Sequence, residues 1–369
     1  MLILTINAGS SSLRLSLFAQ TDDGLERLAE VHHEGICDSN LSLLADFIAT
    51  VDSPEITLIA HRVVHGGALL TSPSLIDAVV EAEIERLTPL APLHNPPALV
   101  WVRSARRLLG DQLPQVAVFD TAFYRSLPEV AATYALPNEL CRRHGIRRYG
   151  FHGIAHQAMW QRWRELRPDI EHGGRIISIQ LGSGCSITAI NRGVPVDTSM
   201  GFSPLEGLVM ATRCGDIDPA IVTYLQRETG LSVDETERVL NKQSGLFGLS
   251  GESSDMRVLL DSDSPEARLA VDLYCYRVRK YIGAYLAVLG SIDAIVFGGG
   301  VGEKSSRIRT RILQGMQGLG LVLDSMLNDN AVDQEACISS RVSRSEVWVI
   351  PVDEAGVMVR EALRQMSGV

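Results

Sequence analysis

The fold of this chain is constrained most by short segments that are almost continuously apolar and rich in β-branched residues. Four of them are 115–119 (QVAVF), 175–179 (RIISI), 293–297 (DAIVF) and 346–350 (EVWVI). A strand has this composition when both faces of its sheet are covered, because neither face then needs polar side chains. Helical spacing alternates with these segments; the longest helical stretch, 265–289, has Ser264 to cap its start and Gly290 to end it. The alternation predicts an α/β protein.

A faint internal repeat suggests that this arrangement occurs twice. Residues 2–18 (LILTINAGSSSLRLSLF) and 176–190 (IISIQLGSGCSITAI) each predict a strand, a small-residue turn and a second strand. Both turns place Gly before Ser, at Gly9 and at Gly182. Two readings are open: two related domains that face one cleft, or two glycine hairpins that resemble each other by chance. Under the first, the domain boundary falls near 142–149.

Size and charge limit the classes of function. The 369 residues correspond to about two domains at roughly 150 residues each. Hydrophobic residues make up 46% and charged residues 21%, which excludes a disordered chain. The formal charge is 34 − 44 = −10, and an acidic surface repels phosphate backbones, so we expect no nucleic-acid partner. An anionic ligand would need a local cluster of positive groups.

Neither a membrane span nor a disulfide framework is expected. No segment approaches the ~18 consecutive apolar residues of a transmembrane helix. Residues 1–6 predict a first strand rather than a signal peptide. The six cysteines form no CxxC pair, which favours free thiols in a reducing cytoplasm over disulfides or a zinc site.

Three small-residue turns are candidates for binding phosphate. They lie at 7–12 (NAGSSS), 182–184 (GSG) and 298–303 (GGGVGE), the last directly after a predicted strand. Glycine lets the backbone approach a ligand closely, and exposed backbone N–H groups suit phosphate oxygens. None of them matches a P-loop or a dinucleotide fingerprint. Each alone could be a plain turn, whereas three in one chain favour a nucleotide-phosphate cleft.

Charged residues at strand ends supply two further candidate groups. Asp120 follows one predicted strand, and Asp353 and Glu354 follow another, where α/β proteins collect ligands and where a hard cation would find oxygen ligands. Helix capping is the alternative. Basic loops at 61–67 (HRVVHGG) and 147–153 (RRYGFHG) place Arg and His beside glycines. Such loops fit recognition of a small anion, and a structural role for the histidines is the alternative.

Taken together, the motifs resemble the acetate kinase family, which includes propionate and butyrate kinases, over nearly the whole chain. The resemblance rests on INAGSSS (6–12), HRVVHGG (61–67), PLAPLHNPP (89–97), FDTAF (119–123), RRYGFHG (147–153), VDTSMGFSPLEGL (196–208), TRCGDIDP (212–219) and GGGVGE (298–303). It implies two related actin-like (ribonuclease H-like) domains with a cleft between them, the first spanning 1–148 and completed by about 355–369, the second spanning 149–354. It also implies reversible phosphoryl transfer between ATP and a short-chain carboxylate, dependent on Mg²⁺ (or Mn²⁺), in a cytoplasmic homodimer.

The resemblance also implies roles for individual residues. Asn7 and Glu354 correspond to the metal site, Arg62 and Arg213 to the pair that holds carboxylate and phosphoryl group, His152 to the transition-state stabiliser and Asp120 to the catalytic acid. The alkyl pocket would be lined by Val64, Leu93, Phe151 and Pro204. The nucleotide site would comprise Arg14, Gln180, Leu181, Gly182, Ser183, Gly184, Asp255, Met256, Arg257, Gly300, Val301, Gly302, Glu303 and Lys304.

Several positions depart from the family pattern, mostly on the nucleotide side. Arg14 stands where Lys is usual, Gln180 and Ser183 replace His and Asn, and Lys304 replaces Asn. Tyr124 replaces His, and Ile154 and Ala155 replace Thr and Ser. We therefore expect altered use of the phosphate donor with the carboxylate chemistry retained. A kinase for propionate or a longer acid, and an actin-like nucleotide-binding module without carboxylate kinase activity, remain the alternatives.

Overall fold

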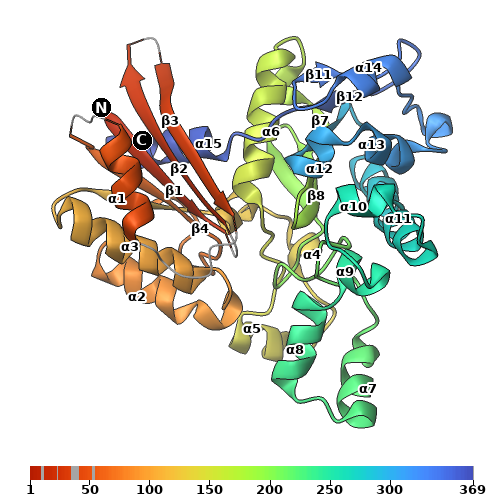
Figure 1. Ribbon diagram of the computed structural model, residues 1–369, viewed down its shortest axis with the longest axis horizontal. Coiled ribbons are helices and arrows are strands. Elements are labelled where there is room, and N and C mark those ends of the chain that lie inside the picture. The colour runs from red at the N-terminus through yellow and green to blue at the C-terminus, as the bar shows by residue number, and fades with distance from the viewer. Residues whose placement is uncertain (10–11, 23, 35–40, 52–54, 369) are drawn as a thin grey trace. The chain divides into compact units, whose positions relative to one another are not determined.

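The computed structural model describes the chain except for residues 10–11, 23, 35–40, 52–54 and 369 (Figure 1). Ser10, Ser11 and Cys37 of the sequence arguments lie outside the described residues. The chain divides into two compact units. Unit 1 comprises Met1–Arg125, Phe151–Ile154 and Asp353–Val369, and unit 2 comprises Ser126–Gly150 and Ala155–Val352. Compactness thus assigns 126–150 to unit 2, whereas the sequence placed its domain boundary after residue 148; that boundary stays a prediction.

Unit 1 is built on a six-stranded sheet of order β3-β2-β1-β4-β6-β5. Its strands are β1 (Leu2–Ala8), β2 (Ser12–Thr21), β3 (Gly24–Glu34), β4 (Leu58–Val63), β5 (Ser74–Leu75) and β6 (Gln115–Phe119). β1, β2 and β3 form an antiparallel meander, β1, β4 and β6 run parallel, and β5 pairs antiparallel at the edge. Only the parallel strands need helical crossovers, so the helices of this unit come after the meander in the sequence.

Helices cover the part of this sheet formed by β1, β4 and β6, whose residues are buried along nearly the whole of each strand. They are α1 (Leu41–Thr50), α2 (Ala78–Arg86), α3 (Asn95–Leu109) and α15 (Glu354–Ser367), with short 3₁₀ turns at Thr88–Leu90 and Asp120–Tyr124. Leu4, Ile6 and Leu15 of the strands pack with Phe47 of α1 and Trp101 of α3. α15 contacts β1, β4 and β6. Burial of this apolar surface is the main term that stabilises the unit.

Unit 2 repeats the same sheet. Its strands are β7 (Arg175–Leu181), β8 (Cys185–Asn191), β9 (Val194–Thr198), β10 (Ala294–Gly298), β11 (Ala336–Cys337) and β12 (Glu346–Val349). They take the order β11-β12-β10-β7-β8-β9, with an antiparallel meander β7-β8-β9, parallel β7, β10 and β12, and an antiparallel edge strand β11. Read from the meander outward, this is the connectivity of unit 1. The predicted internal repeat and α/β class are therefore confirmed at the level of topology.

The helices that follow α3 in the chain belong mostly to unit 2. They are α4 (Glu129–Ala132), α5 (Asn138–His144), α6 (Gly153–Leu166), α7 (Pro219–Thr229), α8 (Val233–Lys242), α9 (Gly245–Ser250), α10 (Met256–Asp261), α11 (Pro265–Leu289), α12 (Gly299–Lys304), α13 (Ser306–Leu313) and α14 (Ser325–Asn330), with 3₁₀ turns at Glu171–Gly173 and Gln317–Leu319. α11 begins and ends as predicted: the Ser264 hydroxyl accepts the Ala267 N–H (3.1 Å), and Gly290 follows with φ of 75°. Trp163 of α6 is fully buried and donates to the Gly173 carbonyl (2.9 Å).

Two expected absences can be examined in the described part of the chain. Among the described helices, none combines the length and the apolar character needed to cross a bilayer. The five described cysteines are all free thiols; they are Cys141, Cys185, Cys214, Cys275 and Cys337.

Candidate functional site

In unit 1, polar residues gather where the parallel strands end. Asn7 lies near the end of β1, Arg62 near the end of β4, and Asp120 follows β6. Ile6 pairs with His61, and Arg62 pairs with Val118, so these ends lie at one edge of the sheet. The parallel register therefore assembles residues that are far apart in the sequence.

These residues form one hydrogen-bonded array. Arg62 donates from Nε to Asp120 Oδ1 (3.1 Å) and from Nη2 to Oδ2 (2.7 Å), so the pairing is bidentate. Its Nη1 donates to Asn7 Oδ1 (3.2 Å), and Asn7 Nδ2 donates to Glu354 Oε2 (2.6 Å) in the first turn of α15. The Asp120 side chain is fully buried and that of Arg62 is 13% exposed. Predicted metal, substrate and catalytic residues of unit 1 thus lie in direct contact.

The electrostatics of the array keep the arginine charged. Burial by itself would lower the pKa of Arg62, but the carboxylates of Asp120 and Glu354 outweigh that effect and raise it. Burial raises the pKa of Asp120, and the opposing attraction of Arg62 offsets part of that rise. A buried carboxyl group is tolerated here because the guanidinium satisfies both of its oxygens.

His152 is held beside Asp120 by an unusual backbone. Its φ of 55° lies in the left-handed region, which costs a non-glycine residue roughly 1–3 kcal/mol. Its backbone N–H hydrogen-bonds the Asp120 carboxylate. The next residue must be glycine, because a Cβ on Gly153 would lie 1.9 Å from the Asp120 carbonyl oxygen. Backbone strain such as that of His152 is typical of functional sites. The close approach of the Asp120 carbonyl oxygen explains why the motif carries glycine at position 153.

The remaining predicted residues of unit 1 lie on neighbouring segments. Arg14 faces Asn7 across the β1–β2 ladder. Val64 and Phe151 are buried, and the Tyr124 hydroxyl donates to the Phe151 carbonyl (2.9 Å). Leu93 is 37% exposed. Whether the apolar ones line one alkyl pocket stays a prediction.

The histidines of the HRVVHGG motif take the structural role that the sequence analysis left open as the alternative to anion recognition. His61 is buried with its Nε2 2.7 Å from Gln115 Oε1, and burial lowers its pKa to about 4. His65 Nδ1 accepts the Gly67 N–H (2.9 Å), and burial lowers its pKa to about 4 as well. Both are neutral at pH 7. Asn95, which the sequence analysis did not single out, bridges the His65 backbone N–H and C=O.

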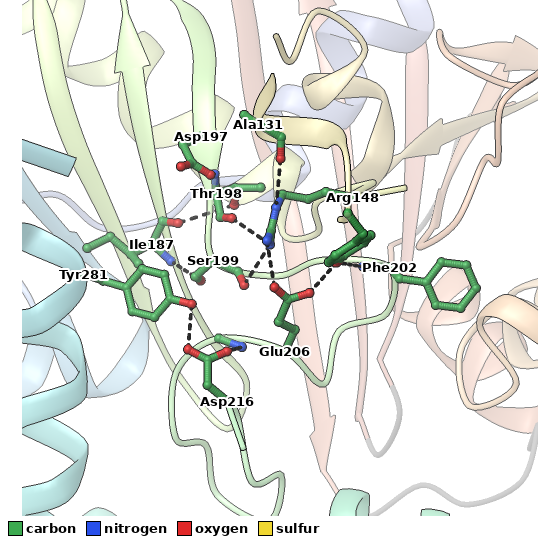
Figure 2. Close-up of polar contacts among 12 residues, drawn as sticks. Ala131, Arg148, Ile187, Asp197, Thr198, Ser199, Phe202, Glu206, Asp216 and Tyr281 are labelled. Carbon is green, nitrogen blue, oxygen red and sulfur yellow. Dashed lines mark hydrogen bonds and ion pairs between the residues drawn. The ribbon is translucent and has the colours of Figure 1, made fainter. Parts of the chain in front are cut away.

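In unit 2, two predicted substrate residues lie on a stretch without helix or strand, 199–216. Arg213 Nη1 donates to the Pro204 carbonyl at 2.7 Å. A cluster around Arg148, Glu206 and Asp216 surrounds this stretch (Figure 2). The sequence analysis did not assign a role to Arg148, which lies in the motif RRYGFHG, or to Glu206, which lies in VDTSMGFSPLEGL. Their separation along the sequence gives no sign that they pair.

The predicted nucleotide residues of unit 2 lie on the β7–β8 turn, on α10 and on α12. Gly182 N–H donates to the Gly184 carbonyl (3.0 Å) and closes the turn. Asp255 caps α10 through the Arg257 N–H (2.9 Å) and also pairs with the Arg257 side chain. Glu303 Oε1 accepts the N–H of Gly299 (2.7 Å), so this carboxylate makes a hydrogen bond within α12.

α12 is further fixed by a fully buried arginine. Arg309 donates to Asn328 Oδ1 and to the carbonyls of Gly302, Glu303, Asn328 and Ala331 at 2.7–3.0 Å. All its donors are thereby used on amide and carbonyl oxygens. Burial lowers its pKa to about 10, an effect that the Asp329 carboxylate partly opposes. Sequence patterns did not reveal this residue, because one arginine among several on α13 looks like a surface charge.

The comparisons with known proteins agree on one family. The family model described as the Acetokinase family matches residues 28–360. The chain is 46% identical to an acetate kinase of Streptomyces coelicolor, over 96% of this chain and 87% of the relative. Among solved structures it is similar to an acetate kinase of Porphyromonas gingivalis (35% identity, TM-score 0.88, 99% of each chain). A propionate kinase from Francisella tularensis matches with the same identity and TM-score, over 98% of this chain and 99% of that one.

Proposed function

The chain belongs to the acetokinase family, and on this premise we propose that it is an acetate kinase, which transfers a phosphoryl group reversibly between ATP and acetate. The observation that carries the proposal is the buried array of unit 1. Arg62 is charged, bidentate on Asp120 and linked through Asn7 to Glu354. A nucleotide-binding module that only hydrolyses or senses ATP has no need of such an array for a second, anionic substrate.

The proposed phosphoryl transfer needs charge neutralisation more than it needs a general base. A carboxylic acid with a pKa near ~4 is already ionised at pH 7, so the nucleophile needs little activation. The barrier lies in bringing that anion up to a polyphosphate, and positive groups lower it by neutralising the equatorial oxygens and aligning the attack. We assign this work to Arg62, Arg213 and His152.

Asp120 is an orienting group in this scheme. Both its oxygens accept from Arg62, which fixes the plane of the guanidinium. With these contacts already made, Asp120 aims Arg62 rather than removing a proton from a substrate. Asp120→Asn should therefore lower turnover at saturating substrate by about 10²-fold through misplacement of Arg62. Near-normal turnover would contradict this role.

The donor set of unit 1 also fits Mg²⁺. The cation prefers oxygen ligands and usually takes one or two carboxylates, with water and substrate phosphates completing its shell. Glu354 and the Asn7 amide oxygen would hold it, and the Asn7 oxygen, which accepts from Arg62 Nη1, would have to turn from Arg62 to the ion. When bound, the ion supplies positive charge that draws the phosphoryl oxygens into line. Among the described residues there is no group of three or more His, Cys, Asp or Glu placed to hold a metal by themselves.

The nucleotide is assigned to unit 2, at the β7–β8 turn, α10 and α12. The glycine-rich start of α12 offers backbone N–H groups, as phosphate sites do. Because Gln180, Ser183 and Lys304 depart from the family pattern, we expect weakened or altered donor use. Initial rates with ATP, GTP and pyrophosphate test this expectation; normal, tight use of ATP would show that these departures are neutral.

Acetate is favoured over propionate by the curated relatives, but a propionate kinase structure matches as well as an acetate kinase structure. One methylene changes selectivity by only ~10- to 200-fold in such pockets. The deciding experiment measures acyl phosphate as its hydroxamate over a panel of C2 to C5 acids. The highest kcat/KM with acetate supports the proposal, the highest with propionate favours the second candidate, and no acyl phosphate from any acid rejects both.

We also propose a cytoplasmic homodimer. α11 exposes Leu269 and Tyr276, which lie seven residues apart on one face of the helix, and a second copy would cover these apolar side chains. Light scattering after gel filtration should give twice the mass of the chain; a monomer at micromolar concentration would contradict it.

A further inference from the structure

The segment 199–216 of unit 2 carries two predicted substrate residues, Pro204 and Arg213, yet it contains neither helix nor strand. A long irregular segment has no ladder of backbone hydrogen bonds to hold its shape. Its side chains and those of its neighbours must do so instead. We call it the 199–216 loop and ask which residues fix it.

Arg148 holds the beginning of this loop. Its Nη1 donates to the carbonyls of Thr198 (3.1 Å) and Ser199 (3.3 Å), where β9 ends and the loop begins. Its Nη2 forms an ion pair with Glu206 Oε1 at 2.7 Å, and its Nε donates to the Ala131 carbonyl at 3.2 Å. One guanidinium therefore joins four acceptors from three segments of the chain (Figure 2).

Tyr134 completes the contacts of Glu206. Its hydroxyl donates to Glu206 Oε2 and accepts the Phe202 N–H at 2.8 Å. The Arg148 guanidinium lies over the Tyr134 ring at 5.5 Å. The loop backbone passes directly against this pair, because a Cβ on Gly201 would lie 1.6 Å from Glu206 Oε2. The geometry is thus tight enough to exclude any side chain at that point.

The far end of the loop is fixed by a second acid. Asp216 Oδ1 accepts the Gly207 N–H (2.8 Å), and the Gly207 carbonyl accepts the Asp216 N–H (3.0 Å). Tyr281 of α11 donates to Asp216 Oδ2 at 2.8 Å, and Arg277 donates to the Asp216 carbonyl at 3.1 Å. Both ends of the loop are therefore held by side chains of unit 2.

Arg213 is joined to this framework by a hydrogen bond of its side chain. Its Nη1 donates to the Pro204 carbonyl, and Pro204 lies between the two residues, Phe202 and Glu206, that Tyr134 and Arg148 hold. We propose that Arg148, with Glu206 and Tyr134, is a positioning network that sets the direction of the Arg213 guanidinium through the Pro204 carbonyl. This inference rests on the proposed function for the role of Arg213 toward the anionic substrates.

The test begins with Arg148→Lys. A lysine keeps the positive charge beside Glu206 but cannot serve acceptors in the planar fork that arginine provides. We expect kcat to fall about 10- to 100-fold, because small misplacements of a catalytic group have effects of this size, and KM for the carboxylate to rise more than KM for the nucleotide. Arg142→Lys on α5 is the matched control, because Arg142 is exposed and its ion-pair partner, Glu139, is exposed as well. It should leave both constants unchanged.

A double-mutant cycle separates positioning from general damage. If Arg148 acts through Arg213, the effect of Arg148→Lys should shrink to less than about 2-fold in an Arg213→Lys background, because interacting residues are non-additive. Full additivity would overturn the proposal. Tyr134→Phe enters the same cycle with a smaller effect, and it carries the test if Arg148→Lys does not fold.

Hydrogen exchange provides a readout that does not need catalysis. Amides of 201–207 should exchange at least about 10-fold faster in Tyr134→Phe or Arg148→Lys than in the parent, while amides of α11 stay unchanged. Unchanged exchange in the loop would overturn the network. Failure of the proposed function would appear differently, as absence of acyl phosphate formation by the parent protein with its loop still protected.

Discussion

The two sheets of this protein share their connectivity but differ in what stands at the ends of equivalent strands. The registers align Asn7 with Gln180, Arg62 with Gly298 and Asp120 with Val352. Unit 1 thus has a buried ion pair where unit 2 has a glycine and a valine.

The comparison shows that strand connectivity fixes where a site can lie, whereas the side chains at the strand ends determine its chemistry. In unit 1 the edge holds charge that must be compensated by neighbours, as Arg62 and Asp120 compensate each other. In unit 2 the same edge has no room for a side chain: a Cβ on Gly298 would lie 2.5 Å from Met159 Sδ. Under the proposed function, the first edge would hold the anionic substrate and the cation, and the glycine-rich start of α12 that follows the second edge would hold the phosphate chain.

The largest effect is expected from removing the charge at the unit 1 edge. Arg62→Met leaves the Asp120 carboxylate buried without its partner, which should lower the free energy of unfolding by about 3–5 kcal/mol and abolish measurable transfer. Urea unfolding and the hydroxamate assay measure the two effects. Gly298→Ala, at the equivalent position of unit 2, should destabilise through overpacking without this loss of charge compensation. If Arg62→Met remained as active as the parent, the contrast between the edges would have no functional meaning.

The next effect concerns the glycine beside the strained histidine. Gly153→Ala places a Cβ against the Asp120 carbonyl oxygen, so His152 and Asp120 must separate. We expect kcat to fall about 10²-fold and the protein to lose about 1–3 kcal/mol of stability. Gly318→Ala in the 3₁₀ turn Gln317–Leu319 is the control, because Gly318 is exposed and its Cβ would meet nothing within 4 Å. That variant should be as active and as stable as the parent.

A third prediction addresses the edge of unit 2. Arg309→Lys leaves several buried carbonyls without donors, which should cost about 1–3 kcal/mol of stability. Because Arg309 holds the end of α12, KM for the nucleotide should rise while KM for the carboxylate stays within about 2-fold. Steady-state kinetics with each substrate varied in turn measure this split. Equal changes in both KM values would contradict the assignment of α12 to the nucleotide.

The last prediction is a loss of stability in mild acid, which needs no substitution. Burial lowers the pKa of His61 and His65 in unit 1 to about 4 and that of His156 in unit 2 to about 3, from an ordinary 6.5. Between these values the unfolded chain binds protons that the folded chain does not, so the free energy of unfolding falls as the pH falls below 6.5. In that window each histidine changes the free energy of unfolding by about 1.4 kcal/mol per pH unit. Above the window its whole contribution to the free energy of unfolding is present.

His156→Gln tests the contribution of unit 2 to that slope. His156 lies between the hydroxyls of Ser178 and Ser186, each at 2.8 Å, where a glutamine amide can replace part of the hydrogen bonding. Urea unfolding at pH 7 and pH 5 should show a smaller loss in the variant than in the parent. Identical slopes would mean that His156 is not held neutral in the folded state.

Much of the fold could be predicted from the sequence because its signals are local. The apolar segments 115–119 and 175–179 became β6 and the start of β7, and Ser264 and Gly290 bound α11. The repeat was visible only as two similar hairpins, and the full equivalence of the sheets emerged from strand pairing. Of the site, residue types and motifs were visible, but Arg148 with Glu206 and the clamp made by Arg309 were not, because their partners are distant in the sequence.

The sequence alone determined the α/β class, the acidic surface and the motifs that identify the family, since these depend on residue type and spacing. The tertiary structure decided which charges compensate one another. Arg62 and Asp120 are 58 residues apart, and Asn7 and Glu354 are 347 apart. The structure also decided that His61 and His65 are neutral core residues, because burial and hydrogen-bond partners set the protonation of a side chain. Both depend on distances in space, and spacing along a chain does not encode them.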